Sequence, residues 1–316
     1  MTITQFLVTI AVWYLSYLLR VFDYLKIQFT QSCRPSVSGI RVERIEIPSR
    51  DRGRTIPGIR YSPEGAQGRL PVHISWQASG WVLRRLGLDH YMLSTFAKRL
   101  NAVVIDAAYR KGPMHKYPSA QNDCEDAVAY VLANSSTYDT SRLTIGGSSA
   151  GGCMALATAA SFGPSKIRGV FSLYPVTRVQ PVSEMSKTKR QLNKKFYSGI
   201  VLRLWILDLF IRAYSTGKEA ELAEPRFSPY NCDVSMLPNH ILIACGDADV
   251  LYEDCQKMVE KIHTEGSPQQ KSNTEFMSIP DESHEFNNFP THPHSYEWRD
   301  KLYDAAIAKI RAAWAN

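Results

Sequence analysis

The run Leu143 to Gly152 (LTIGGSSAGG) reads as a strand, a tight turn and the start of a helix. Within it, Gly147-x-Ser149-x-Gly151 has small residues two positions before and two after Ser149, as a strained turn requires when it presents a hydroxyl. The same G-x-S-x-G pattern also occurs by chance in turns that carry no nucleophile. The apolar strand pattern before it and the helix-forming residues after it favour a nucleophile.

Ser149, rather than Ser148, is the predicted nucleophile, because moving the frame back by one puts Ala150 where the second glycine belongs. The turn would place Ser149 at a helix N-terminus, where free backbone N–H groups favour negative charge. We therefore expect the Ala150 amide to be one donor of an oxyanion hole.

After residue 40, short apolar runs alternate with longer helical patterns, which implies parallel strands covered on both faces and joined by right-handed crossovers. We predict an α/β fold, a mostly parallel central sheet flanked by helices, over residues 40–316. The expected strands are Leu70 to Trp76, Ala102 to Tyr109, Arg142 to Gly146, Gly169 to Tyr174, His240 to Cys245 and Glu275 to Ile279. The expected helices are Tyr91 to Leu100, Ala120 to Leu132, Ala150 to Ala160, Glu253 to His263 and Trp298 to Ala313.

The composition narrows the class of protein. Hydrophobic residues make up 44% and charged residues 21%, which argues against a disordered, collagen-like or multi-span membrane protein. The formal net charge of +7 is modest, and the single basic run lacks interleaved aromatic residues, so no nucleic-acid partner is expected. Six widely spaced cysteines predict neither a zinc site nor a dense disulfide framework, which favours a reducing compartment.

The interval between Tyr174 and His240 is far longer than an ordinary connection of about two to six residues, so we predict a cap insertion over about residues 176–238. It contains an apolar helical stretch, Ile200 to Tyr214. Its apolar helix either faces the substrate pocket or, with the basic run before it, binds a membrane surface. That run comprises Arg178, Lys187, Lys189, Arg190, Lys194 and Lys195.

Residues 1–30 form a predicted hydrophobic helix. Met1 to Leu19 carries no charge and, at about 1.5 Å per residue, nearly spans a hydrocarbon layer of about 30 Å. Three alternatives stay open: a transmembrane span, an interfacial helix, or a helix docked over the active site. A polar stripe along the helix favours lying flat, and it comprises Thr2, Gln5, Thr9, Ser16, Arg20 and Asp23.

Basic residues follow this segment and none precedes it, so a spanning helix would leave the bulk of the chain in the cytosol. We therefore expect a membrane-associated protein with a cytosolic catalytic domain, the endoplasmic reticulum being one candidate membrane.

Several motifs resemble the hormone-sensitive-lipase-like branch of the α/β-hydrolase fold, over roughly residues 40–315. The elbow reads G-S-S-A-G-G where that branch has G-D-S-A-G-G. Tyr109 to Ala120 is similar to the branch's Y-R-L-A-P-E-H-x-F-P-A-A, and Gly246 to Leu251 to its D-P-L turn. Its oxyanion loop is H-G-G-G, and here Ala78 and Ser79 replace two glycines. Their amides still donate, provided that the loop needs no positive φ there.

The chain order of this fold is serine, then acid, then histidine. By the D-x-L pattern Asp249 is the predicted acid, with Asp247 as the alternative, while Glu253 suits the start of the next helix. His284 is the predicted histidine, because it follows the last strand in a loop that resembles the branch's H-G-F. Glu285 replaces that glycine, and its charge is expected to raise the pKa of the imidazole.

The other histidines beyond Asp249 are interpreted as bystanders, one in a helix and two in the following loop: His263, His292 and His294.

The resemblance implies a serine hydrolase of carboxylic esters. His284 takes the proton of Ser149 as the hydroxyl attacks the ester carbonyl, and Asp249 holds the histidine tautomer. This chemistry needs no metal and no organic cofactor. The oxyanion hole is assigned to the amides of Ala78, Ser79 and Ala150.

Aromatic residues near the predicted mouth (Trp76, Trp81 and Tyr109) and the apolar cap helix favour a hydrophobic small-molecule ester, although each aromatic residue also suits a core. The resemblance extends to esterases of fungal specialised metabolism and implies a similar role. Acyl transfer or lactone opening would use the same triad. The other classes are a non-catalytic small-molecule receptor on this fold, against which His284 argues, and a membrane-associated scaffold.

Overall fold

The computed structural model describes residues 3–31, 37–180 and 194–315, and its strands form one eight-stranded sheet. The strands are β1 (Ile40–Pro48), β2 (Thr55–Pro63), β3 (Leu70–Trp76), β4 (Val103–Ala107), β5 (Tyr138–Ser148), β6 (Gly169–Leu173), β7 (His240–Gly246) and β8 (Thr274–Ile279). Their order is β1-β2-β4-β3-β5-β6-β7-β8, and all neighbours from β4 to β8 are parallel. The predicted α/β architecture and its six strands are confirmed.

Two antiparallel strands, β1 and β2, were not expected. They form a hairpin at one edge of the sheet, and β2 joins it to β4. Exposed and buried residues mix along β1, so it lacks the continuous apolar run by which the inner strands are recognised.

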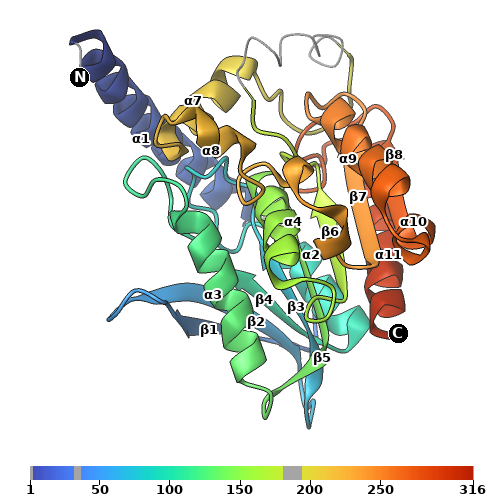
Figure 1. Cartoon of the computed structure of the whole chain (residues 1–316). Helices are drawn as coiled ribbons and strands as arrows, with labels where there is room; N and C mark the ends of the chain where they lie inside the picture. Colours follow the sequence, from blue (N-terminus) through green and yellow to red (C-terminus); the bar gives the residue numbers. More distant parts are fainter. Residues whose placement is uncertain (1–2, 32–36, 181–193, 316) are drawn as a thin grey trace.

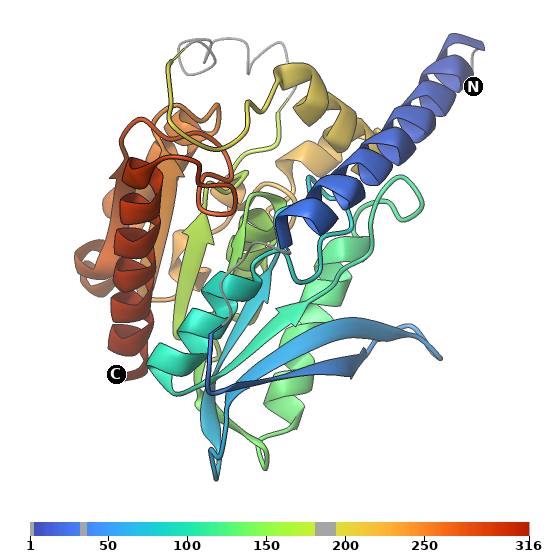
Figure 2. The same ribbon diagram turned by 180° about the vertical axis from the view of Figure 1, so that it is seen from behind.

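The long helices cover both faces of the sheet (Figures 1 and 2). α3 and α4 pack together on one face, with α9 beside β7 and β8, while α2 and α11 pack together on the other. The helices are α1 (Ile3–Gln31), α2 (His90–Leu100), α3 (Ser119–Ala133), α4 (Ala150–Phe162), α7 (Leu204–Tyr214), α8 (Glu219–Ala223), α9 (Tyr252–Glu265), α10 (Pro268–Asn273) and α11 (Pro293–Ala315).

The predicted cap interval lies between β6 and β7, and its described part includes α7 and α8. Part of the basic run, Lys187, Lys189 and Arg190, lies outside the described residues. Lys194 is described and pairs with Asp247.

Helix α1 packs beside α7 at the cap and extends past the body of the molecule (Figure 1). The later part of its polar stripe faces the protein: Ser16 and Asp23 are buried, and the Arg20 side chain donates to the Val82 carbonyl at 3.0 Å and to the Gly112 carbonyl, whereas Thr9 is exposed. No helix in the described part of the chain is long and apolar enough to cross a membrane, so the predicted transmembrane span is not supported. The third alternative, a helix docked over the active site, stays a prediction.

Candidate active site

Ser149 lies between β5 and α4, at the predicted strand-to-helix turn. Its backbone has φ 55° and ψ −119°, a conformation that an L-residue adopts only under strain, and the residue is 6% exposed. Because α4 begins at Ala150, the first amides of the helix lie next to the hydroxyl.

The flanking glycines allow this turn to pack. A Cβ at Gly147 would lie 2.5 Å from the carbonyl carbon of Gly151, and a Cβ at Gly151 would lie 2.0 Å from the carbonyl oxygen of Trp76. Real Cβ atoms do not approach that closely, so both positions require glycine because of close backbone approach.

His284 and Asp249 reach Ser149 from the ends of two neighbouring strands. His284 Nε2 lies 3.0 Å from Ser149 Oγ, and His284 Nδ1 lies 2.6 Å from Asp249 Oδ2. Asp249 follows β7 and is 1% exposed, while His284 follows β8 and is 3% exposed. The carboxyl ends of β5, β7 and β8 thus bring the three predicted residues into one hydrogen-bonded chain.

The alternative residues have other partners. Asp247 accepts from the Asp281 backbone amide at 2.8 Å and pairs with Lys194. Glu253 lies in the first turn of α9, as expected. The other histidines make separate contacts: His263 Nε2 is 3.2 Å from the Thr274 carbonyl, and His292 and His294 lie against Tyr197.

The charges around His284 set its pKa. Burial lowers the pKa of the imidazole, whereas the charge of Asp249 and its hydrogen bond raise it, and the net shift is upward. Glu285 adds to the rise, as the sequence predicts, and Arg85 opposes it. The Tyr174 ring packs against the imidazole at 4.6 Å between centroids.

The predicted oxyanion loop needs no positive φ at Ala78 or Ser79, which is the condition for those two residues to replace glycines. In residues 77–81 only Gly80 and Trp81 have positive φ, so Ala78 and Ser79 are unstrained where the resemblance has glycines. Within the described chain the amides of the predicted donors Ala78, Ser79 and Ala150 donate to no protein acceptor, and neither does the amide of Gly80. The oxyanion assignment stays a prediction.

Side chains hold this loop in place. The Tyr109 hydroxyl donates to the Gln77 carbonyl at 2.7 Å, and the Ser79 hydroxyl lies 2.6 Å from Tyr109 Oη. The Ser79 oxygen also accepts from the Trp81 amide at 3.0 Å and from Lys111 Nζ at 3.2 Å. Ser79 therefore takes the role of a structural anchor that a glycine lacks.

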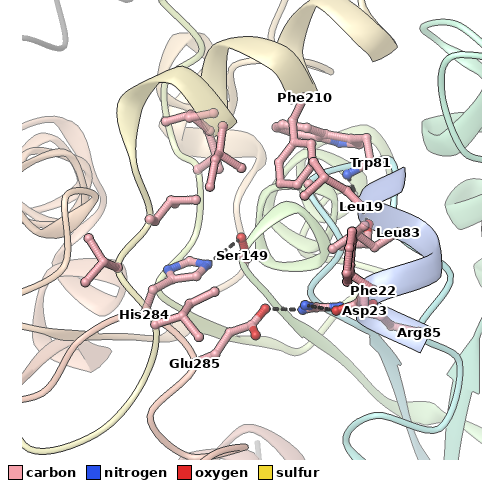
Figure 3. Close-up of a pocket in the computed structure, with 18 residues that line it drawn as sticks. Leu19, Phe22, Asp23, Trp81, Leu83, Arg85, Ser149, Phe210, His284 and Glu285 are labelled. Atoms are coloured by element: carbon pink, nitrogen blue, oxygen red, sulfur yellow. Dashed lines mark hydrogen bonds and ion pairs between the residues drawn. The ribbon is translucent and has the colours of Figure 1, made fainter. Parts of the chain in front are cut away.

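A cavity of about 230 Å³ opens above Ser149 and His284 (Figure 3). Ser79 and Gly80 line it, whereas Ala78 packs against Leu88 and Phe289 outside the lining. The remaining lining is mostly apolar and comes from the cap, the oxyanion loop and α1: Leu19, Phe22, Trp81, Leu83, Val176, Ile200, Val201, Leu202, Ile206, Leu207 and Phe210.

Sequence reasoning missed a charged cluster in the same cavity, made of Asp23, Arg85 and Glu285 (Figure 3). Arg85 Nε lies 2.9 Å from Asp23 Oδ2, and Arg85 also pairs with Glu285. Asp23 belongs to the polar stripe of α1, but nothing in the sequence around Arg85 indicates either partner.

Comparison with known proteins decides the family. A family model described as the alpha/beta hydrolase fold matches residues 76–288. The chain belongs to this α/β-hydrolase family. The match contains the nucleophile elbow, the acid turn and the histidine loop, and the predicted resemblance is confirmed.

Relatives of this α/β hydrolase include esterases. It is 27% identical over 207 residues to the versiconal hemiacetal acetate esterase of Emericella nidulans, covering 64% of this chain and 71% of that one. It is 28% identical over 251 residues to an α/β hydrolase of Acanthamoeba polyphaga mimivirus, covering 77% and 68%. The solved hyperthermophilic esterase of Pyrobaculum calidifontis aligns with a TM-score of 0.79 and 25% identity, covering 94% and 92%. The protein is a serine ester hydrolase of the α/β-hydrolase fold.

Proposed function

We propose that this esterase hydrolyses hydrophobic small-molecule carboxylic esters through Ser149, His284 and Asp249. The observation that carries the proposal is the continuous hydrogen-bonded chain from Ser149 Oγ to the Asp249 carboxylate, buried beneath an apolar cavity. Asp249 holds Nδ1 protonated, so that neutral Nε2 accepts the serine proton during attack.

The developing oxyanion is stabilised by the free amides of the loop and of the helix start. Ser79 and Gly80 line the cavity with Ser149, and Ala150 is the first residue of α4. The amide of Ala78, the remaining predicted donor, lies directly before that of Ser79 in the chain. Protonated His284 then returns the proton to the leaving alcohol, and water releases the acyl group.

The substrate is a compact lipophilic ester whose acyl group is short. The cavity is small, and its lining is apolar apart from the catalytic groups and the charged cluster. A relative is named an acetate esterase of versiconal hemiacetal, which supports removal of a short acyl group from a larger scaffold in specialised metabolism.

Turnover of p-nitrophenyl esters from acetate to palmitate by the full chain tests this function. Ser149→Ala should abolish turnover, while Ser148→Ala, a change at the adjacent buried serine, should keep most of it. Acetate or butyrate should be preferred over palmitate. Full turnover by Ser149→Ala at unchanged thermal stability would refute the mechanism, and a preference for palmitate would refute the short acyl group.

We also propose that α1 rests on a membrane surface, because its outward face exposes large apolar and aromatic side chains. Trp13, Tyr14, Tyr17 and Phe22 are exposed, with Tyr17 at 66% and Phe22 at 67%. Tryptophan and tyrosine suit the lipid headgroup region, and the basic chain suits anionic lipids. Phe22 also lines the cavity, so a lipophilic ester would enter from the lipid side.

Flotation with phosphatidylserine-containing vesicles tests this second proposal. The wild-type chain should float with the vesicles, and the double variant Trp13→Ser/Tyr17→Ser should not. Tyr296→Ser, which removes an exposed tyrosine on α11, is the matched control and should float. A wild-type chain that stays with the soluble fraction would refute membrane docking.

A further inference from the structure

Arg85 joins two carboxylates that come from opposite ends of the chain. Its Nε donates to both carboxylate oxygens of Asp23 on α1, at 3.0 and 2.9 Å, and its other arm pairs with Glu285. All three side chains are at least nine-tenths buried. Figure 3 shows Arg85 between Asp23 on the ribbon of α1 and Glu285 on the histidine loop.

Glu285 follows His284 directly and has φ 60°, in the left-handed region that favours glycine. Its carbonyl accepts from the amides of Asn288 and Phe289 at 3.0 and 3.2 Å, so this residue begins the turn that carries the histidine loop away from β8. A glutamate in such a position costs backbone strain, which must be offset by a specific contact. The ion pair with Arg85 is the contact that holds the Glu285 side chain.

The pairing also fixes α1. Asp23 is the only acidic residue of α1, and Arg85 is its ion-pair partner within the described residues. Seating of α1 and placement of the residue beside His284 therefore depend on the same guanidinium. Asp23 and Glu285 have no bond to each other in the described part of the chain, and Arg85 is the group that is bonded to both.

We propose that Arg85 is a positioning residue that couples the docking of α1, through Asp23, to the placement of His284, through Glu285. This inference rests on the proposed hydrolysis by Ser149 and His284. When α1 is seated, Arg85 is held between two carboxylates and fixes the Glu285 backbone. When Asp23 is lost, Arg85 loses its anchor, and the strained residue beside His284 is less well held.

A double-mutant cycle between Asp23→Asn and Glu285→Gly tests the coupling, with kcat for p-nitrophenyl acetate as the readout. Asn replaces Asp without changing its shape, and glycine at position 285 adopts the observed φ without strain. Asp23→Asn alone should lower kcat about tenfold, but less than about twofold in the Glu285→Gly background. Arg84→Met, at the exposed neighbouring arginine, is the matched control and should leave kcat unchanged.

The pH profile separates a positioning role from a purely structural one. The groups that face His284 are Asp249, Glu285, Arg85, Ser149 and the Tyr174 ring. Glu285 raises the pKa of His284 and Arg85 lowers it, so Glu285→Gly should move the acidic limb of kcat/KM to lower pH, and Arg85→Met should move it to higher pH.

The coupling would be overturned if Asp23→Asn lowers kcat equally in the wild-type and Glu285→Gly backgrounds, or lowers it in neither. It would also be overturned if neither Glu285→Gly nor Arg85→Met moves the acidic limb. Thermal unfolding of each variant shows that the chain is folded. Ser149→Ala, assayed alongside, distinguishes the two failures. If the Ser149→Ala chain is active, the proposed function is refuted. If it is inactive and the effects of Asp23→Asn and Glu285→Gly on kcat are additive, only the role of Arg85 is refuted.

Discussion

Gly80 of the oxyanion loop lies so close to Phe210 of the cap helix α7 that a Cβ at Gly80 would fall 2.0 Å from Phe210 Cδ2. The backbone there also has φ 55°. The cap therefore packs directly on the loop that is predicted to bind the oxyanion, and only glycine permits both the turn and the contact.

Gly80→Ala should destabilise the chain by about 2 to 4 kcal/mol, because the methyl group adds a clash to the backbone strain. Gly217→Ala is the matched control: its φ is 89°, but nothing lies within 4 Å of a Cβ there, so only strain is added. Thermal or denaturant unfolding measures the difference. A second change, Phe210→Ala, should relieve part of the Gly80→Ala loss, and equal losses for the two glycine variants would contradict the clash.

The acidic limb of kcat/KM should lie above the ordinary histidine pKa of about 6.5, because burial lowers the pKa of His284 but Asp249 and Glu285 together raise it, and the net shift is upward. The neutral imidazole is the base, so activity rises as pH increases through that pKa and falls below it. A pH–rate profile in a series of overlapping buffers measures the limb. A midpoint clearly below that of a free histidine would show that burial dominates instead.

Asp249→Asn should lower kcat by about 10² to 10⁴, because the amide no longer fixes the Nδ1–H tautomer or stabilises the imidazolium. Asp247→Asn is the control, since Asp247 is bonded to the Asp281 amide and to Lys194 at the surface side of the loop. Single-turnover kinetics with p-nitrophenyl acetate measure both variants. A larger loss in Asp247→Asn than in Asp249→Asn would reverse the assignment of the acid.

Tyr109→Phe should lower kcat about tenfold or more while leaving the fold intact, because it removes the hydroxyl that bonds the Gln77 carbonyl and receives the Ser79 proton. The loop amides would then be less well oriented toward the oxyanion. Tyr130→Phe, a change at a half-buried tyrosine of α3, serves as the control. If Tyr109→Phe raises KM with kcat unchanged, the hydroxyl acts on substrate binding and not on the oxyanion loop.

The elements that can be predicted from the sequence are those that a pattern of neighbouring residues encodes. The inner strands are continuous apolar runs, and the elbow and the two later turns carry their chemistry in consecutive residues. Strands β1 and β2 are not predicted from the sequence because exposed and buried residues mix along an edge hairpin. The sequence predicts the polar stripe of α1 but not which way the stripe faces. A stripe of polar residues is compatible both with solvent and with a protein surface that offers matching donors and acceptors.

By itself, the sequence determined the α/β fold, the elbow with Ser149, and the order of acid and histidine that led to Asp249 and His284, since short-range patterns encode each of these. Only the tertiary structure decided that these side chains form one hydrogen-bonded chain, that Ser79 and Gly80 line the cavity, and that Arg85 bridges Asp23 and Glu285. Those relationships join residues far apart in the chain. They exist because folding brings distant residues together, and no local pattern shows which partner each residue, charged ones included, will meet.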